Sequence, residues 1–211
     1  MKTRTLQMLL LLLLLPGMAA AEPPPHYRVE LLVFARIGAG DGGERWPQVS
    51  SRPQPYTALG PGAEADAQPE TPRTLEGARQ VLLQSGGYRP LLHLAWRQPA
   101  LDQEQARPVW IAQPSPPQAG EPKVEGTARI MLRRFLHLQL DLVYLPRGEP
   151  EPWAMDAHQS GIFHLAQRRR VRPGEIHYFD HPRFGVLAVV ERAPASEPPP
   201  EGAVPIPLGQ P

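Results

Sequence analysis

The chain contains no cysteine, and this absence excludes several kinds of protein at once. Without thiols there is no disulfide scaffold, no thiolate zinc site, no catalytic cysteine and no lipid-modified N-terminal cysteine. Aromatic residues are scarce as well, at 7% of the 211 residues, whereas 41% of residues are hydrophobic. This composition supports one modest hydrophobic core rather than a large enzyme with several lobes.

A hydrophobic run long enough to cross a membrane is also missing. The longest run, at residues 9–15, is preceded by Lys2 and Arg4 and followed by three alanines that end at Ala21. This order is typical of a secretory signal peptide, and a transmembrane helix needs about 20 apolar residues. We therefore expect export across the inner membrane, cleavage after Ala21 and no membrane span.

Neither sign of charge is in large excess. The chain has 22 basic and 21 acidic residues, a formal net charge of +1. Removing the signal peptide takes away two basic residues and no acidic one, which leaves −1. Binding to nucleic acid requires a net basic surface, so nucleic acid is not an expected partner.

Proline and glycine, by contrast, are plentiful. The 29 prolines and 18 glycines make up about 22% of the chain, just below the range of unperiodic low-complexity sequence. They gather at residues 37–70, 114–123 and 193–211. The last stretch has few large apolar residues to bury, which is typical of disorder. We predict a signal peptide at 1–21, one domain at 22–192 with a flexible loop at 37–70, and a disordered tail at 193–211.

Alternating apolar residues predict several strands. Residues 27–36 show the alternation most clearly. Similar patterns predict strands at 88–99, up to about 171 and at 184–192, with a short edge strand at 108–111. Residues 130–144 form either one long strand or two strands joined by a bulge near Arg133 and Arg134.

One segment has the spacing of a helix. Thr71 can act as N-cap with Pro72 in the first turn, apolar residues follow at 75, 78, 81 and 82, and Ser85-Gly86-Gly87 provides a stop. The predicted class is α+β, with a mainly antiparallel sheet of about five to six strands, one packed helix and long Pro/Gly-rich loops.

The densest group of ionisable residues lies at 168–183. Four arginines in five positions, at 168–170 and 172, repel one another, and a carboxylate or phosphate partner would relieve this repulsion. Aromatic side chains suit sugar rings or apolar contacts. The predicted binding residues are Arg168, Arg169, Arg170, Arg172, Glu175, His177, Tyr178, Asp180, His181 and Trp96. The alternative is that these charges pair with each other and fix how the last strands meet.

A second hypothesis for the same segment is the active site of a metal enzyme, with Glu175, His177, Asp180 and His181 as ligands. Pro182 pushes His181 toward an extended conformation, so the two histidines would not share a helix face. The HExxH spacing is absent, and no serine lies in a G-x-S-x-G or S-x-x-K motif. We therefore predict no catalytic residue, no metal and no cofactor.

Four stretches of the sequence belong together as a pattern: YRVELLVFAR, LLHLAWRQP, FLHLQLDL and, most specifically, RRRVRPGEIHYFDHPRFGVL. Together they resemble the CsiV family of periplasmic peptidoglycan-binding proteins. The resemblance spans residues 27–192, apart from the loops, and implies a non-enzymatic protein of Gram-negative bacteria that binds peptidoglycan and supports cell-wall assembly and cell shape. The first alternative is an adaptor whose arginine segment docks on a cell-wall synthase or its regulator, and the second is a metal-dependent wall hydrolase.

Overall fold

The structure is a computed structural model that describes residues 23–38, 67–113, 120–146 and 162–194. The predicted signal peptide, most of the predicted loop at 37–70 and nearly all of the predicted tail lie outside the described residues. Within the described residues there are nine strands and one helix. The elements are β1 (His26–Arg36), β2 (Gln68–Glu70), α2 (Glu76–Gln84), β3 (Tyr88–Pro99), β4 (Val109–Ala112), β5 (Lys123–Leu132), β6 (Leu136–Leu145), β7 (Phe163–Arg170), β8 (Ile176–Asp180) and β9 (Phe184–Ala193).

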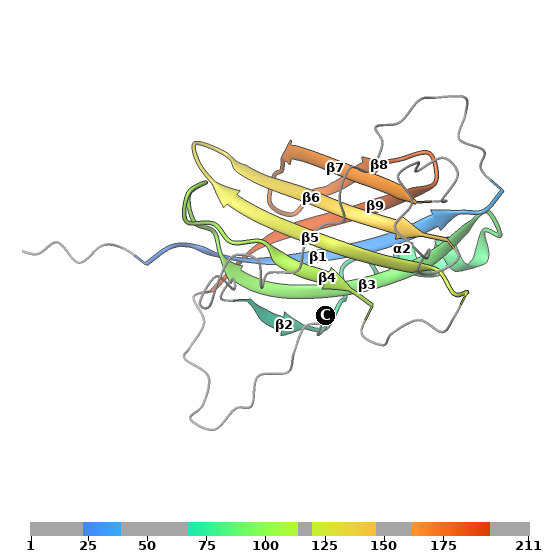
Figure 1. The fold of residues 1–211 in the computed structure, drawn as a ribbon. Helices are drawn as coiled ribbons and strands as arrows, with labels where there is room; N and C mark the ends of the chain where they lie inside the picture. Colours follow the sequence, from blue (N-terminus) through green and yellow to red (C-terminus); the bar gives the residue numbers. More distant parts are fainter. Residues whose placement is uncertain (1–22, 39–66, 114–119, 147–161, 195–211) are drawn as a thin grey trace, which may run out of the picture.

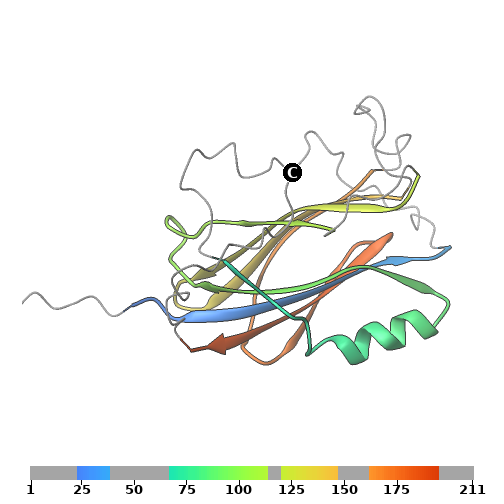
Figure 2. The same cartoon turned by 90° about the horizontal axis from the view of Figure 1, so that it is seen from below.

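The strands form two antiparallel sheets. A five-stranded sheet has the order β2-β3-β1-β9-β8, and a four-stranded sheet has the order β4-β5-β6-β7. The two sheets are stacked, and α2 lies on the outer side of the five-stranded sheet (Figures 1 and 2). The α+β class with mostly antiparallel strands is confirmed, but the prediction of a single sheet of about five to six strands is wrong. Alternation marks the apolar face of each strand and does not say which strands share a sheet.

The main hydrophobic core fills the space between the sheets. Leu31 and Val33 of β1 and Val186 of β9 enter it from one side, and Leu138 and Leu140 of β6 enter it from the other. All five side chains are fully buried. Because side chains alternate along a strand, the polar residues between Leu138 and Leu142 lie on the outer face of the four-stranded sheet.

Helix α2 begins later than the sequence predicts. Its N-cap is Leu75 rather than Thr71, and no side chain of its own caps it. The carboxylate of Glu30 on β1 accepts hydrogen bonds from the backbone N–H groups of Arg73, Thr74 and Leu75, at 3.1, 3.0 and 2.8 Å. A distant strand therefore satisfies the free donors at the helix start. No helix in the described ranges is long and apolar enough to cross a membrane.

Glu30 is also the centre of a buried group of charges. It forms an ion pair with Arg28 at 2.7 Å and a hydrogen bond with His93 at 2.9 Å. Arg28 in turn contacts Glu70 of β2 at 2.9 Å. Burial alone would raise the pKa of Glu30, but the hydrogen bonds from Leu75, His93 and the neighbouring amides outweigh it and lower the pKa to about 2. This group ties β2, β3 and α2 to the outer side of β1.

The second half of the chain contains a hairpin and a strand that the sequence did not fully predict. The stretch 130–144 is divided between β5 and β6, which pair with each other across a turn at 133–135. Between the strands predicted up to about residue 171 and at 184–192, the structure contains β8, a strand with one buried apolar side chain, Phe179. One buried residue in five is too weak an alternation to indicate a strand from sequence.

Candidate functional site

The predicted binding segment is shared between the two sheets. Its first part is β7, which is an edge strand of the four-stranded sheet, and its second part is β8, which is an edge strand of the five-stranded sheet. Its side chains therefore fall into groups that face different directions. These groups lie at the seam between the sheets, on the two outer faces, in the connecting turn and in the core.

Arg169 and Gln167 lie at the seam between β7 and β8. Gln167 Nε2 donates to the backbone carbonyl oxygen of Asp180 at 2.9 Å, and Arg169 Nη1 donates to that of Tyr178 at 2.9 Å. The Arg169 guanidinium also lies over the Phe179 ring, 5.4 Å from its centre. These bonds satisfy carbonyl groups on the free edge of β8, which would otherwise be open to other chains. Although exposed, Arg169 therefore has a structural role in holding the two sheets together.

Arg168 and Arg170 point to the opposite side of β7. They are exposed on the outer face of the four-stranded sheet, where Arg168 lies opposite Gln139 and Arg170 opposite His137 of β6. The Arg170 guanidinium lies 3.4 Å from the centre of the Phe135 ring. We call this surface the arginine face, and its members are Thr127, Arg129, His137, Gln139, Asp141, His164, Ala166, Arg168 and Arg170.

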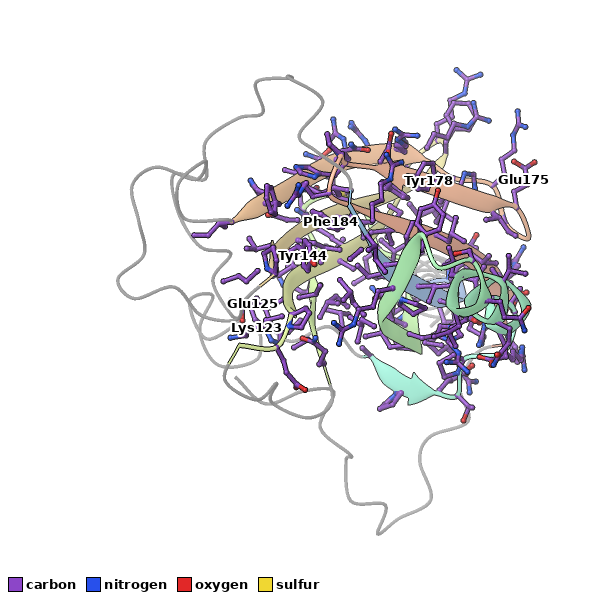
Figure 3. All side chains as sticks on the ribbon, turned by 90° about the vertical axis from the view of Figure 1, so that its right-hand side faces the viewer. Lys123, Glu125, Tyr144, Glu175, Tyr178 and Phe184 are labelled. Carbon is purple, nitrogen blue, oxygen red and sulfur yellow. The ribbon has the colours of Figure 1, made fainter. Side chains whose placement is uncertain are left out.

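The arginine face also holds an acidic side chain and a fixed arginine. Asp141 Oδ1 lies 2.6 Å from His164 Nε2. Arg129 Nη2 donates to the backbone carbonyl oxygen of Gln103, which orients this arginine from the side of β5. Lys123 and Glu125 form an ion pair at 3.1 Å on the side of the molecule away from α2 (Figure 3). The face is therefore polar along much of its length and contains both signs of charge.

Arg172 and Glu175 lie in the turn that joins β7 to β8, and His177 is the second residue of β8. Arg172 Nη1 lies 3.4 Å from Glu175 Oε1, and the Arg172 backbone N–H donates to His177 Nε2 at 3.0 Å. The turn includes Gly174 with a φ of 79°, a conformation that glycine adopts without strain. These three residues pair with one another, which matches the alternative that the charges fix how the last strands meet.

Tyr178 lies on the outer side of the five-stranded sheet, the side of α2 (Figure 3). Asp180, two residues further along β8, lies on the same side. The Tyr178 hydroxyl donates to Asp180 Oδ1 at 2.5 Å, and Arg36 Nη2 donates to the same oxygen at 2.7 Å. Partial burial and the bond to Asp180 raise the pKa of Tyr178. Sequence reasoning missed Arg36, because nothing in the sequence indicates that the side chain at the end of β1 reaches Asp180 of β8.

Trp96 and His181 are buried. Trp96 is fully enclosed in the core and donates from Nε1 to Gln98 Oε1 at 2.6 Å. His181 is 1% exposed, with its ring 5.0 Å from that of Phe184, and burial lowers its pKa to about 4. In Figure 3, Phe184 lies between the sheets. Burial leaves both predicted binding residues without access to a ligand at the surface, so neither is kept in the candidate site.

The four residues considered as metal ligands are not gathered in one place. Glu175 is in the turn, His177 and Asp180 point to opposite sides of β8, and His181 is buried. No group of three or more His, Asp or Glu side chains suited to a metal ion occurs in the part of the chain that the structure describes. The geometry of these side chains offers no metal centre.

The fold and the arginine face together define a β-sandwich with a charged patch on the outer face of its four-stranded sheet, an arrangement suited to surface binding. A family model described as "Peptidoglycan-binding protein, CsiV" matches residues 62–193. This match covers more than half of the chain, and the protein therefore belongs to the CsiV family of peptidoglycan-binding proteins. No curated protein and no solved structure matches the chain.

Proposed function

We propose that this chain is a non-enzymatic periplasmic protein that binds peptidoglycan through its arginine face and thereby supports cell-wall assembly and cell shape. Membership of a peptidoglycan-binding family supports the choice of partner. The exposed positions of Arg168 and Arg170 on the four-stranded sheet support the choice of face. Export to the periplasm rests on the signal-like N-terminal sequence.

The observation that carries this proposal is that the four arginines at 168–170 and 172 point in different directions and have different partners. Arg169 and Arg172 have partners within the protein, at the seam and in the turn. Arg168 and Arg170 are exposed on the outer face of the four-stranded sheet. Figure 2 shows that sheet on the side of the sandwich opposite α2. Two cations held side by side on a rigid strand form a better receptor than cations on a loop.

The physical chemistry of the wall suits such a face. Peptidoglycan presents the carboxylates of its stem peptides between acetylated sugars, and guanidinium groups bind carboxylates with two parallel hydrogen bonds. Each exposed contact is worth about 1 kcal/mol or less and weakens as salt increases. Firm retention would therefore come from many weak contacts along an insoluble polymer.

Co-sedimentation of the purified protein with isolated sacculi, across a salt series, tests this proposal. We expect the pelleted fraction to be high at low salt and to fall as salt rises. Arg168→Gln should lower it, whereas the control Arg73→Gln should not, because Arg73 is 71% exposed on the opposite side, near α2. Equal retention of both variants would move the binding site away from the arginine face.

The absence of catalysis is tested separately. Prolonged incubation of sacculi with the protein should release no soluble muropeptides, with or without a chelator. Release that depends on the protein and stops with chelator would support the hydrolase alternative instead.

A protein adaptor is a second candidate, because large apolar side chains are exposed on the side of α2. Val81 and Leu83 on α2 and Ile176 on β8 are 66%, 51% and 60% exposed. Such residues can contact a partner such as a cell-wall synthase or its regulator. A pure adaptor would stay in the supernatant when mixed with sacculi alone, which separates it from the wall-binding protein.

A further inference from the structure

We propose that the arginine face recognises a free amino-acid head group of the wall peptide, with its carboxylate and its ammonium bound at adjacent positions. This inference rests on the proposed function and specifies which chemical group the face binds. It is carried by the order of charges across β5, β6 and β7. The glycan and an isolated carboxylate are the competing ligands.

Two neighbouring rows of side chains cross the arginine face. In one row, Gln139 of β6 lies between Arg129 of β5 and Arg168 of β7. In the next row, Asp141 of β6 lies between Thr127 of β5 and Ala166 of β7. Rows on one face of a strand are about 7 Å apart, a gap that a long arginine side chain can close. A positive row therefore lies directly beside a negative position.

Asp141 is suited to accept an ammonium group. Its bond to His164 uses Oδ1, and its side chain remains 39% exposed. No described residue donates a hydrogen bond to Oδ2. Its direct neighbour on β7 is Ala166, whose small and exposed side chain leaves the carboxylate open from that direction.

Arg168 is suited to accept the carboxylate of the same head group. It lies on the β7 strand two residues after Ala166, so that it is diagonally adjacent to Asp141. On the other side of Gln139, the contact with Gln103 holds Arg129 in place. A carboxylate at Arg168 and an ammonium at Asp141 would each meet the opposite charge, whereas a second carboxylate near Asp141 would be repelled.

The aromatic side chains of this face are less suited to a sugar ring. Sugar rings stack on open aromatic surfaces, but the Arg170 guanidinium lies 3.4 Å from the centre of the Phe135 ring and occupies one of its faces. The indole of Trp110 is half-buried on the edge strand β4. The exposed groups that remain are charged or hydrogen-bonding, and these favour the peptide over the glycan.

Chemically modified sacculi test this inference. One batch has its free amines acetylated, one has its carboxylates amidated, and one is untreated. We expect each modification to lower the retention of the unmodified protein by about three- to five-fold, the value of one exposed ionic contact. The variant Asp141→Asn keeps a hydrogen-bond acceptor for His164 but loses the negative charge. Its retention on untreated sacculi should equal the retention of the unmodified protein on acetylated sacculi. Acetylation of the sacculi should not change the retention of this variant.

Controls separate this inference from the proposed function. Glu76→Gln on α2 removes an exposed acid from the opposite side of the molecule and should behave as the unmodified protein does. Sensitivity to amidation without sensitivity to acetylation would overturn the head-group inference and leave wall binding by the arginine face intact. Retention that neither modification changes would point to the glycan as the ligand and would also overturn the head-group inference. No retention on untreated sacculi would overturn both the head-group inference and the proposed wall binding.

Discussion

Replacing Arg168 and Arg169 one at a time should separate wall binding from stability. The two residues are neighbours in sequence and carry the same charge, but they point to opposite sides of β7. Arg169 donates to the Tyr178 carbonyl at 2.9 Å and covers the Phe179 ring. Arg168 is exposed opposite Gln139 on the outer face.

The structure sets the size of each effect. An intramolecular hydrogen bond contributes about 1 kcal/mol and an exposed cation–π contact about 0.5–1 kcal/mol, so Arg169→Ala should lower the free energy of unfolding by about 1–2 kcal/mol. For a domain of this size that corresponds to a decrease in Tm of about 3–6 °C. Arg168→Ala should change stability by less than about 0.5 kcal/mol, as is usual for an exposed side chain.

The effects on wall binding should be reversed. Loss of one exposed ionic contact weakens retention by up to about five-fold, so Arg168→Ala should lower the fraction pelleted with sacculi at low salt. Arg169→Ala should pellet as the unmodified protein does at temperatures where it is folded. Denaturant unfolding and co-sedimentation on the same preparations measure both quantities. If Arg168→Ala destabilised the protein as much as Arg169→Ala, or if Arg169→Ala lost retention without losing stability, the division of β7 by faces would be wrong.

Three further expectations concern stability. Glu30→Gln should lower the free energy of unfolding at pH 7 by about 3 kcal/mol, because a pKa lowered from 4.5 to about 2 corresponds to that amount. Urea unfolding should show the stability difference between this variant and the unmodified protein shrinking as pH falls from 4.5 toward 2. A stability difference that stays constant with pH would contradict the lowered pKa of Glu30. His181, whose pKa is lowered from 6.5 to about 4 by burial, binds its proton more readily in the unfolded chain, so stability should fall between pH 6.5 and 4, with a shallower fall in His181→Asn. Gly126→Ala should prevent stable folding, since a Cβ there would collide with the backbone carbonyl oxygen of Asp141, and a cooperative thermal transition near that of the unmodified protein would refute this.

Alternation along the chain was enough to place most strands but not to assign them to sheets. Residues 27–36, 88–99 and 108–111 correspond closely to β1, β3 and β4. The division into two sheets depends on which apolar faces meet across the core, and those contacts join residues far apart in sequence. The start of α2 was misplaced for the same reason, because the carboxylate that satisfies its first N–H groups comes from Glu30, more than forty residues away.

The candidate site was predictable in part. The exposure of the arginines follows from their number in one short segment, and a strand was expected as far as residue 171. Period-2 alternation within that strand already places Arg169 on one side and Arg168 and Arg170 on the other. The seam could not be found from sequence, because it requires β8 and the knowledge that β8 belongs to the other sheet. The contact between Asp141 and His164 could not be found from sequence either, since only the pairing of β6 with β7 brings these two residues together.

A single strand therefore serves stability and binding through its two faces. Gln167 and Arg169 bond to the edge of β8, while Arg168 and Arg170 face outward. A shift of β7 by one residue would exchange these roles, placing Arg168 and Arg170 at the seam and leaving Arg169 alone on the outer face. The bonds of the seam select one register, and that register sets Arg168 diagonally beside Asp141. In this arrangement the contacts that close the sandwich also fix the spacing of charges that a wall peptide would meet.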